Sequence, residues 1–262
     1  MASDYRRTHR ASKKPGGLHD LHGHSQQPRH EGIGIASTTF TINFSRTFPF
    51  HTGLVPNWTE RGLIVAPMAT VNPHNGHRII ELWNAGVGLD EMIPELEKRD
   101  EHWSWRQVGA VSATGEVFSH TGEDAWDHAS HIEGEGSLAL GNYMDGPEPV
   151  KAMAAALEEG RDPPMDERLM RAIEAGRAAG GQGSLELGPV PEAWAIIQVF
   201  NDKQPRPAVD LRVDFDVNAV PKLRRLLTQT KRMDPVLYTM CFEPSKTFDV
   251  YDVVFEMFTS QV

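Results

Sequence analysis

The sequence is poor in cysteine, contains no long hydrophobic run and has no net positive charge beyond its first 30 residues. Cys241 is its only cysteine, which excludes an intramolecular disulfide and a cysteine-rich metal site. No segment approaches the roughly 20 apolar residues of a membrane span, and no apolar stretch follows the basic start. We therefore expect a cytoplasmic protein in a reducing compartment, without membrane contact.

Charge is unevenly distributed along the chain. The formal net charge is −10, and residues 1–30 carry six Lys and Arg against two Asp and Glu. The first 30 residues thus contribute +4, and the rest of the chain contributes −14. A nucleic-acid surface needs concentrated positive charge for phosphate contacts. We therefore expect a small-molecule substrate and no nucleic-acid partner.

Composition divides the chain into three parts. Residues 1–30 are basic, rich in histidine and poor in apolar residues, which predicts a flexible tail. His19, His22 and His24 have the spacing of zinc or nickel ligands, but a solvated tail lacks the second shell that orients such ligands. Residues 31–232 have the pattern of one domain, and residues 233–262 form an extension that we expect to contain a packed helix. We expect no cofactor and no bound metal in the tail.

Hydrophobic periodicity predicts strands, then a block of helices, then strands. Alternating or β-branched segments that indicate strands are GIGIASTTFTINFS, LIVA, a hairpin RQVGAVSATGEVFSHTG with its turn at residues 113–115, GSLALGNYM, EAWAIIQVF and AVDLRVDF. Segments with helical spacing are HRIIELWNAG, GLDEMIPELEKRD, DGPEPVKAMAAALEEG, MDERLMRAIEAGRAAGG with Asp166 as its N-cap, and AVPKLRRLL. This order predicts an α+β domain in which helices cover antiparallel sheets.

Four segments together resemble one known family. They are VNPHNG before a helix, RQVGAVSATGEVFSHTG, LGNYMDGPEPVKAMAAALEEG and ERLMRAIEAGRAAGG. In this order they are similar to DUF1028, a family of unassigned function that is placed in the N-terminal-nucleophile (Ntn) hydrolase superfamily. The resemblance covers roughly residues 55–227. It implies a four-layer αββα sandwich and, where the catalytic parts are present, hydrolysis of an amide bond.

An Ntn hydrolase needs a Thr, Ser or Cys as the first residue of a processed chain. The free α-amine then serves as the base for that side chain, because its pKa of roughly 7.7–8.0 leaves a neutral fraction at working pH. Removal of Met1 would expose Ala2, which has no nucleophilic side chain. The mechanism therefore requires cleavage before Ser37, Thr38 or Thr39.

The start of the family pattern fits this sequence in two registers. In one, which we prefer, residues 32–37 (GIGIAS) match the second strand of the family over six consecutive positions, and the histidine-rich tail then stands where the nucleophile strand is expected. In the other, residues 39–42 (TFTI) match the strand that begins with the nucleophile. Thr39 and Thr38 are accordingly the candidate nucleophiles.

The resemblance and the ends of the predicted strands supply further candidates. His120 is a candidate catalytic residue, and the amide of Asn142 is a candidate donor to an oxyanion. Substrate-binding candidates share positions at strand ends or before the first helix, and they are Asn72, Arg106, Gln107, Thr121, Gly122 and Gly141. Helix capping is the alternative role for Asn72, and a structural ion pair is the alternative for Arg106.

We expect a hydrolase that cleaves the C–N bond of a small amide or cyclic amide. One alternative is a non-catalytic protein that uses the same sandwich for binding or assembly. Another is a hydrolase that uses metal-activated water near Asp127, His128 and His131, although a solvated loop is the simpler interpretation of that segment. The C-terminal segment could also cover a partner subunit, so a homo-oligomer is a further expectation.

Overall fold

The computed structural model describes residues 32–40, 62–126, 128–159, 163–184, 186, 188–201, 207–246, 252, 254, 255 and 259. The chain divides into two units, residues 1–30 and 31–262, and the fold reported below is that of the second unit. The expected flexible tail with its histidine cluster therefore lies outside the described residues, as do Asp127 and much of the C-terminal extension.

One sheet brings together the first and last strands of the domain. Strand β1 (Ile33–Thr39) pairs antiparallel with β9 (Trp194–Phe200), and β9 pairs antiparallel with β10 (Val209–Val213). The central strand reads WAIIQVF and is buried along most of its length, as expected for a strand that is covered on both faces. Residues 38 and 39, the candidate nucleophiles, lie at the C-terminal end of β1, opposite residues 195 and 194.

A second sheet contains β2 (Leu63–Met68), β3 (Gln107–Ser112) and β4 (Val117–Thr121), all antiparallel to their neighbours. The predicted hairpin of β3 and β4 is confirmed, and Gly115 in its turn has a φ of +89°. A separate hairpin pairs β5 (Ser130–Gly134) with β6 (Ser137–Gly141), and two short strands, β7 (Gly183–Ser184) and β8 (Gly188–Pro189), pair with each other. The expectation of a loop over residues 130–134 is therefore wrong.

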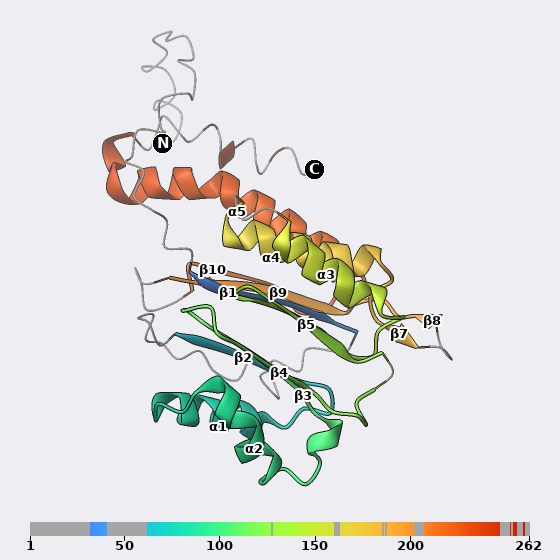
Figure 1. Ribbon diagram of the computed structural model, residues 1–262. Coiled ribbons are helices and arrows are strands. Elements are labelled where there is room, and N and C mark those ends of the chain that lie inside the picture. Colours follow the sequence, from blue (N-terminus) through green and yellow to red (C-terminus); the bar gives the residue numbers. More distant parts are fainter. Residues whose placement is uncertain are drawn as a thin grey trace, which may run out of the picture. The chain divides into compact units, whose positions relative to one another are not determined.

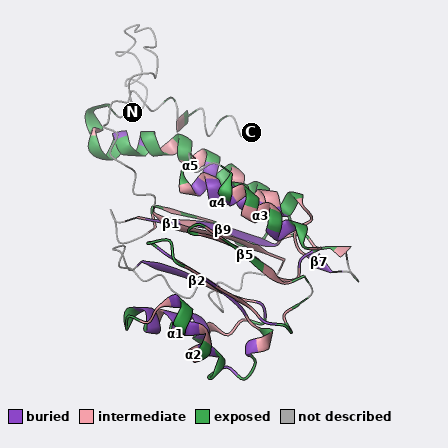
Figure 2. Cartoon of the chain, viewed as in Figure 1, coloured by how far each residue is buried: buried purple, intermediate pink, exposed green. Residues whose placement is uncertain are grey.

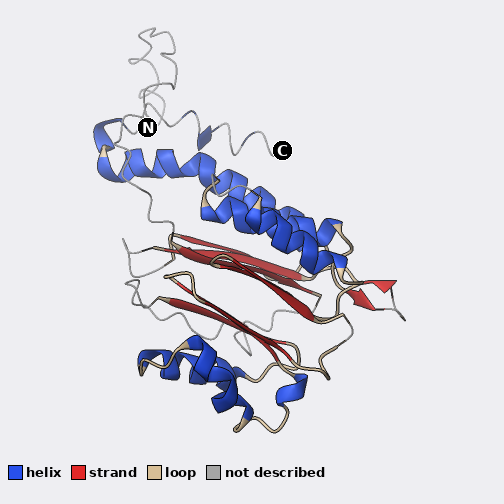
Figure 3. Ribbon diagram, viewed as in Figure 1, coloured by secondary structure: helices blue, strands red, loops and turns tan. Residues whose placement is uncertain are grey.

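Helices lie on both sides of the strands (Figures 1 and 3). Helices α1 (Pro73–Asn84) and α2 (Met92–Glu97) pack on the β2–β3–β4 side, with short 3₁₀ turns at Leu89–Glu91 and Trp103–Trp105. Helices α3 (Glu148–Glu158), α4 (Met165–Ala178) and α5 (Ala219–Phe242) cover β1, β9, β10 and the β5–β6 hairpin. The predicted combination of helices with antiparallel sheets is thus confirmed.

The start of α4 differs from the expectation, and α5 runs across the position of the expected segment boundary. Helix α4 begins at Met165 after Pro164, so Asp166 lies buried in the first turn and is not the N-cap. Helix α5 continues to Phe242, so the boundary expected after residue 232 falls inside a continuous helix. Among the described residues, none of the helices combines the length and the apolar character that a membrane crossing requires.

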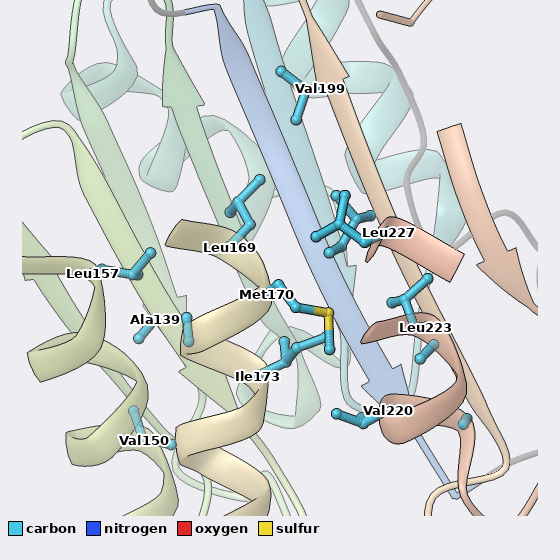
Figure 4. Packing of buried hydrophobic residues seen from close by; sticks show 14 of the residues in the cluster. Ala139, Val150, Leu157, Leu169, Met170, Ile173, Val199, Val220, Leu223 and Leu227 are labelled. Atoms are coloured by element: carbon cyan, nitrogen blue, oxygen red, sulfur yellow. The ribbon is translucent and has the colours of Figure 1, made fainter. Parts of the chain in front are cut away.

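Two hydrophobic cores lie beneath the two sets of helices (Figure 2). The larger core joins α3, α4 and α5 to β6, β9 and their neighbours; among its buried members, Figure 4 labels Ala139, Val150, Leu157, Leu169, Met170, Ile173, Val199, Val220, Leu223 and Leu227. The other core joins α1 and α2 to β2, β3 and β4. A small third cluster of Ile33, Ile64 and Phe200 connects β1 and β9 with β2.

Candidate functional site

A cavity of about 560 Å³ lies where β1, β6 and the β2–β3 pair meet helices α3 and α4. This volume is within the range of ordinary small-molecule sites. The lining is mostly apolar, and its residues from β1, β2, β3, the end of β6, α3 and α4 are Gly34, Ile35, Ala36, Ser37, Thr38, Ile64, Ala66, Met68, Gly109, Ala110, Val111, Leu138, Ala139, Leu140, Gly141, Asn142, Met153, Leu157, Leu169, Ala172, Ile173, Gly176 and Arg177. Arg177 and Glu192, both at the lining, form an ion pair with an N–O distance of 2.7 Å.

The two candidate nucleophiles have different relations to this cavity. Thr38 is part of its lining, and the Thr38 hydroxyl donates to the carbonyl of Trp194 at 2.7 Å. The carbonyl of Thr39 accepts a hydrogen bond from the amide of Ala193 at 2.8 Å, and Thr39 is not a lining residue. Thr38 is therefore a residue of the lining whose hydroxyl is bonded to the neighbouring strand, whereas Thr39 lies beside that strand and outside the lining.

A chain of amide groups begins directly after these threonines. The backbone amide of Phe40 donates to Oε1 of Gln182 at 2.7 Å. Nε2 of Gln182 donates to the carbonyl of Asn142 at 3.3 Å, and Nδ2 of Asn142 donates to Oε1 of Gln107 at 3.2 Å. The end of β1 is thereby connected to two residues that the sequence identified as candidates, Asn142 and Gln107.

Gln107 is the anchor of this chain. Its side chain is fully buried, and Nε2 lies 3.0 Å from Oγ1 of Thr121, from the carbonyl of Ser130 and from the carbonyl of Gly141. A primary amide has two hydrogens for these three acceptors, so one of the bonds is shared. Because Gln107 lies on β3 and its three acceptors lie on β4, β5 and β6, its side chain fixes the relative positions of four strands.

Thr121 connects the network to His131, and Gly141 lies at a tightly packed position of the same network. Oγ1 of Thr121 lies 2.8 Å from Nδ1 of His131 on β5. A Cβ atom at position 141 would lie 2.7 Å from Val150 and 2.9 Å from Met144, which is closer than packed side chains allow. Gly141 is therefore required for packing as well as lining the cavity.

Aromatic side chains stand next to the amide chain. The rings of Phe40 and Tyr143 have centroids 5.1 Å apart, and those of Trp126 and Tyr143 are 5.3 Å apart. Tyr143 has a φ of +53°, a strained conformation that non-glycine residues adopt mainly at special sites. Sequence reasoning did not select Gln182 or Tyr143 as site residues.

The other predicted binding residues form a separate cluster around Asp100. The side chain of Asp100 accepts hydrogen bonds from Nδ2 of Asn72 at 2.9 Å, from Nδ2 of Asn75 at 2.7 Å and from Nε of Arg106 at 3.0 Å. Burial by itself would raise the pKa of Asp100, but the hydrogen bonds from Arg106, Asn72, Asn75 and the amide of His102 outweigh burial and lower that pKa well below its usual value.

This cluster has a structural role in the described part of the chain. Oδ1 of Asn72 also accepts from the amide of His74, so Asn72 is the N-cap of α1. Arg106 donates to the carbonyl of Thr70 besides Asp100. Neither Asn72 nor Arg106 is a lining residue of the cavity.

His120 on β4 and Gly122 directly after this strand lie against residues 103 and 104. His120 stacks on Trp103 with centroids 4.1 Å apart, and its Nε2 lies 3.1 Å from the Trp103 carbonyl. Burial lowers the pKa of His120. A Cβ atom at Gly122 would lie 2.0 Å from the carbonyl oxygen of Ser104, so glycine is required there. The structure thus separates His120 and Gly122 from Thr38 and Asn142.

His131 and Glu133 of β5 each contact a residue of β4. His131 contacts Thr121, and Oε1 of Glu133 lies 2.5 Å from the hydroxyl of Ser119. No group of three or more His, Cys, Asp or Glu side chains is arranged to hold a metal ion among the described residues, a set that does not include Asp127.

Comparisons with known proteins give a family and a fold. The family model for DUF1028, a family of unknown function, matches residues 25–223. The crystal structure of protein SPO2555 from Silicibacter pomeroyi, also assigned to DUF1028, superposes with a TM-score of 0.64 at 20% sequence identity, covering 78% of this chain and 82% of that one. A search of curated proteins finds no match.

Proposed function

Because the chain belongs to the DUF1028 family, whose function is unknown, we propose an activity from the site itself: hydrolysis of the C–N bond of a small, neutral amide on an Ntn-hydrolase-like scaffold. The order of helices, strands, strands and helices in Figure 1 is compatible with an αββα sandwich. The amide would enter the inter-strand cavity, whose apolar lining suits an uncharged substrate.

One observation carries the proposal. The amide chain Phe40–Gln182–Asn142–Gln107 joins the residue after the candidate nucleophiles to the candidate oxyanion donor, and Gln182 and Asn142 of this chain line the cavity. Only one hydrogen of the Asn142 amide is used by Gln107, so the second is available to a developing oxyanion. Thr38 supplies the hydroxyl because it lines the same cavity.

The proposed reaction requires cleavage of the bond between Ser37 and Thr38. Since Thr38 lies near the end of β1, residues 33–37 would keep their pairing with β9 after the cut. The new α-amine of Thr38 would then take the proton of the hydroxyl as its oxygen attacks the substrate carbonyl. The amine product leaves with that proton, and water hydrolyses the ester that remains on Thr38.

The mature N-terminus tests this function. Intact-mass measurement with Edman sequencing of the purified protein is expected to show a chain that begins Thr-Thr-Phe, and Thr38→Ala is expected to remain uncleaved and inactive on small amides. Thr39→Ala is the matched control and should still be cleaved. A sequence beginning Thr-Phe-Thr would assign the role to Thr39, and a chain that keeps residues 1–37 would refute the self-activated mechanism.

A second candidate is a non-catalytic protein that uses the same cavity for binding. The observation in its favour is that Thr38 is an internal residue of the chain, whose hydroxyl donates to the carbonyl of Trp194. An uncleaved protein that binds a neutral ligand without turnover would support this candidate.

A further inference from the structure

Two strands present their edges to the cavity. In the part of the chain that the structure describes, β1 pairs only with β9, and β6 pairs only with β5. Five consecutive residues of β1 (34–38) and five around the end of β6 (138–142) line the cavity. Because successive side chains of a strand point to opposite faces, contact with every residue places the cavity along the strand edge rather than over one face.

The packing of each strand gives the same position. On β1, Gly34 lies against Leu169 of α4, while Ile35 packs with the cluster that contains Ile64 of β2. On β6, Ala139 belongs to the core under α3 and α4, as Figure 4 shows, while Leu138 and Leu140 lie against Gly109 of β3. Both strands therefore lie between the same helices and the same sheet, with the cavity between their edges.

The lining determines what kind of molecule fits. A strand edge offers a row of backbone N–H and C=O groups, so a ligand between β1 and β6 meets hydrogen-bonding groups on both sides. Leu157, Leu169 and Ile173 cover one face of the cavity, and Ile64 and Ala66 cover the other. The lining charges of Arg177 and Glu192 neutralise each other at 2.7 Å.

We propose that this cavity binds its substrate as an extended, uncharged peptide that adds a strand between β1 and β6. The inference rests on the proposed function, and it narrows the substrate from any small neutral amide to a linear peptide. Both faces of the added strand would be covered, so successive side chains should all be apolar instead of alternating. Five residues of strand extend about 17 Å, so the bound segment has about five residues.

Calorimetric titration tests the proposal with a blocked pentapeptide, acetyl-Val-Ala-Val-Ala-Val-amide. The protein is the full-length Thr38→Ala variant, so that turnover does not interfere. Saturable one-to-one binding is expected. An analogue with two N-methyl groups on alternate residues keeps the apolar side chains but loses two donors, and it should bind at least about tenfold more weakly.

Hydrogen exchange and a pair of variants complete the test. The peptide should slow amide exchange in residues 34–38 and 138–142. Ala36→Leu narrows the cavity and should weaken peptide binding, whereas Ala178→Leu, exposed on the same α4 that covers the cavity, should not. No binding of the peptide, equal binding of its N-methyl analogue, or protection at other strands would overturn the proposal.

The outcome is independent of the test of the proposed function. If the chain is never cleaved but binds the peptide, the strand-addition site is supported and the proposed hydrolase activity is refuted. Cleavage before Thr38 with amidase activity but no peptide binding would do the reverse.

Discussion

Replacement of Gln107 by leucine tests whether the buried amide network holds four strands together. Leucine has nearly the volume of glutamine but neither its donor nor its acceptor. The change leaves the carbonyls of Ser130 and Gly141 without the Gln107 amide, and it removes the acceptor of Nδ2 of Asn142. The hydroxyl of Thr121 also loses one partner but keeps His131.

The expected loss follows from the number of groups left unsatisfied. Each lost hydrogen bond in a buried position costs about 1 kcal/mol or more, so three of them lower the free energy of unfolding by about 3 kcal/mol. For a domain of this size, that loss lowers the melting temperature by about 6–12 °C.

Thermal and urea unfolding, followed by circular dichroism, measure the effect. Gln198→Leu is the matched control, because its amide donates to Asp210 at an exposed site, and it should change stability by less than about 0.5 kcal/mol. If Gln107→Leu were as stable as the wild type, the network would not hold the strands, and the reasoning would be refuted.

Three further predictions concern other residues. Asp100→Asn leaves Arg106 without its carboxylate, and it should lower the free energy of unfolding in urea at pH 7 by about 3 kcal/mol. Because the pKa of Asp100 is lowered in the folded state, the difference in stability from the wild type should shrink below about pH 4. Arg224→Ala should lower the free energy of unfolding by about 1–2 kcal/mol. Hydrogen bonding to Arg224 lowers the pKa of Glu167 to about 2, so the difference in stability from the wild type should close as the pH falls from about 4.3 toward 2. In amidase assays, Asn142→Ala should lower kcat about 100-fold, whereas His120→Phe should change it less than about twofold; equal losses in both variants would contradict the site assignment.

Local sequence signals predicted the elements that depend on near neighbours. The hairpin of β3 and β4 follows from the turn at residues 113–115 between two alternating segments, and both strands are present. Strand β5 was missed because its exposed residues, His131 and Glu133, alternate with residues that are only half-buried, and none of its side chains is fully buried. The segment becomes a strand through its pairing with β6. Such pairing is not visible in the segment itself.

Part of the candidate site was predictable because local sequence signals mark the ends of strands. Gln107, Thr121 and Asn142 lie at strand ends, and antiparallel pairing brings those ends together. The sequence could not show which face of β4 each residue occupies, and a shift of one residue reverses the side: Thr121 faces β5, and His120 faces Trp103. Gln182 was missed because its role depends on contacts with Phe40 and Asn142, both far away in the sequence.

The mature N-terminus is the most direct test of the central claim that Thr38 acts as a nucleophile at the inter-strand cavity. Intact mass and Edman sequencing of freshly purified protein should show that residues 1–37 have been separated from a chain that begins at Thr38. A purified protein with an intact Ser37–Thr38 bond would contradict the account, and so would a Thr38→Ala variant that hydrolyses amides at the wild-type rate.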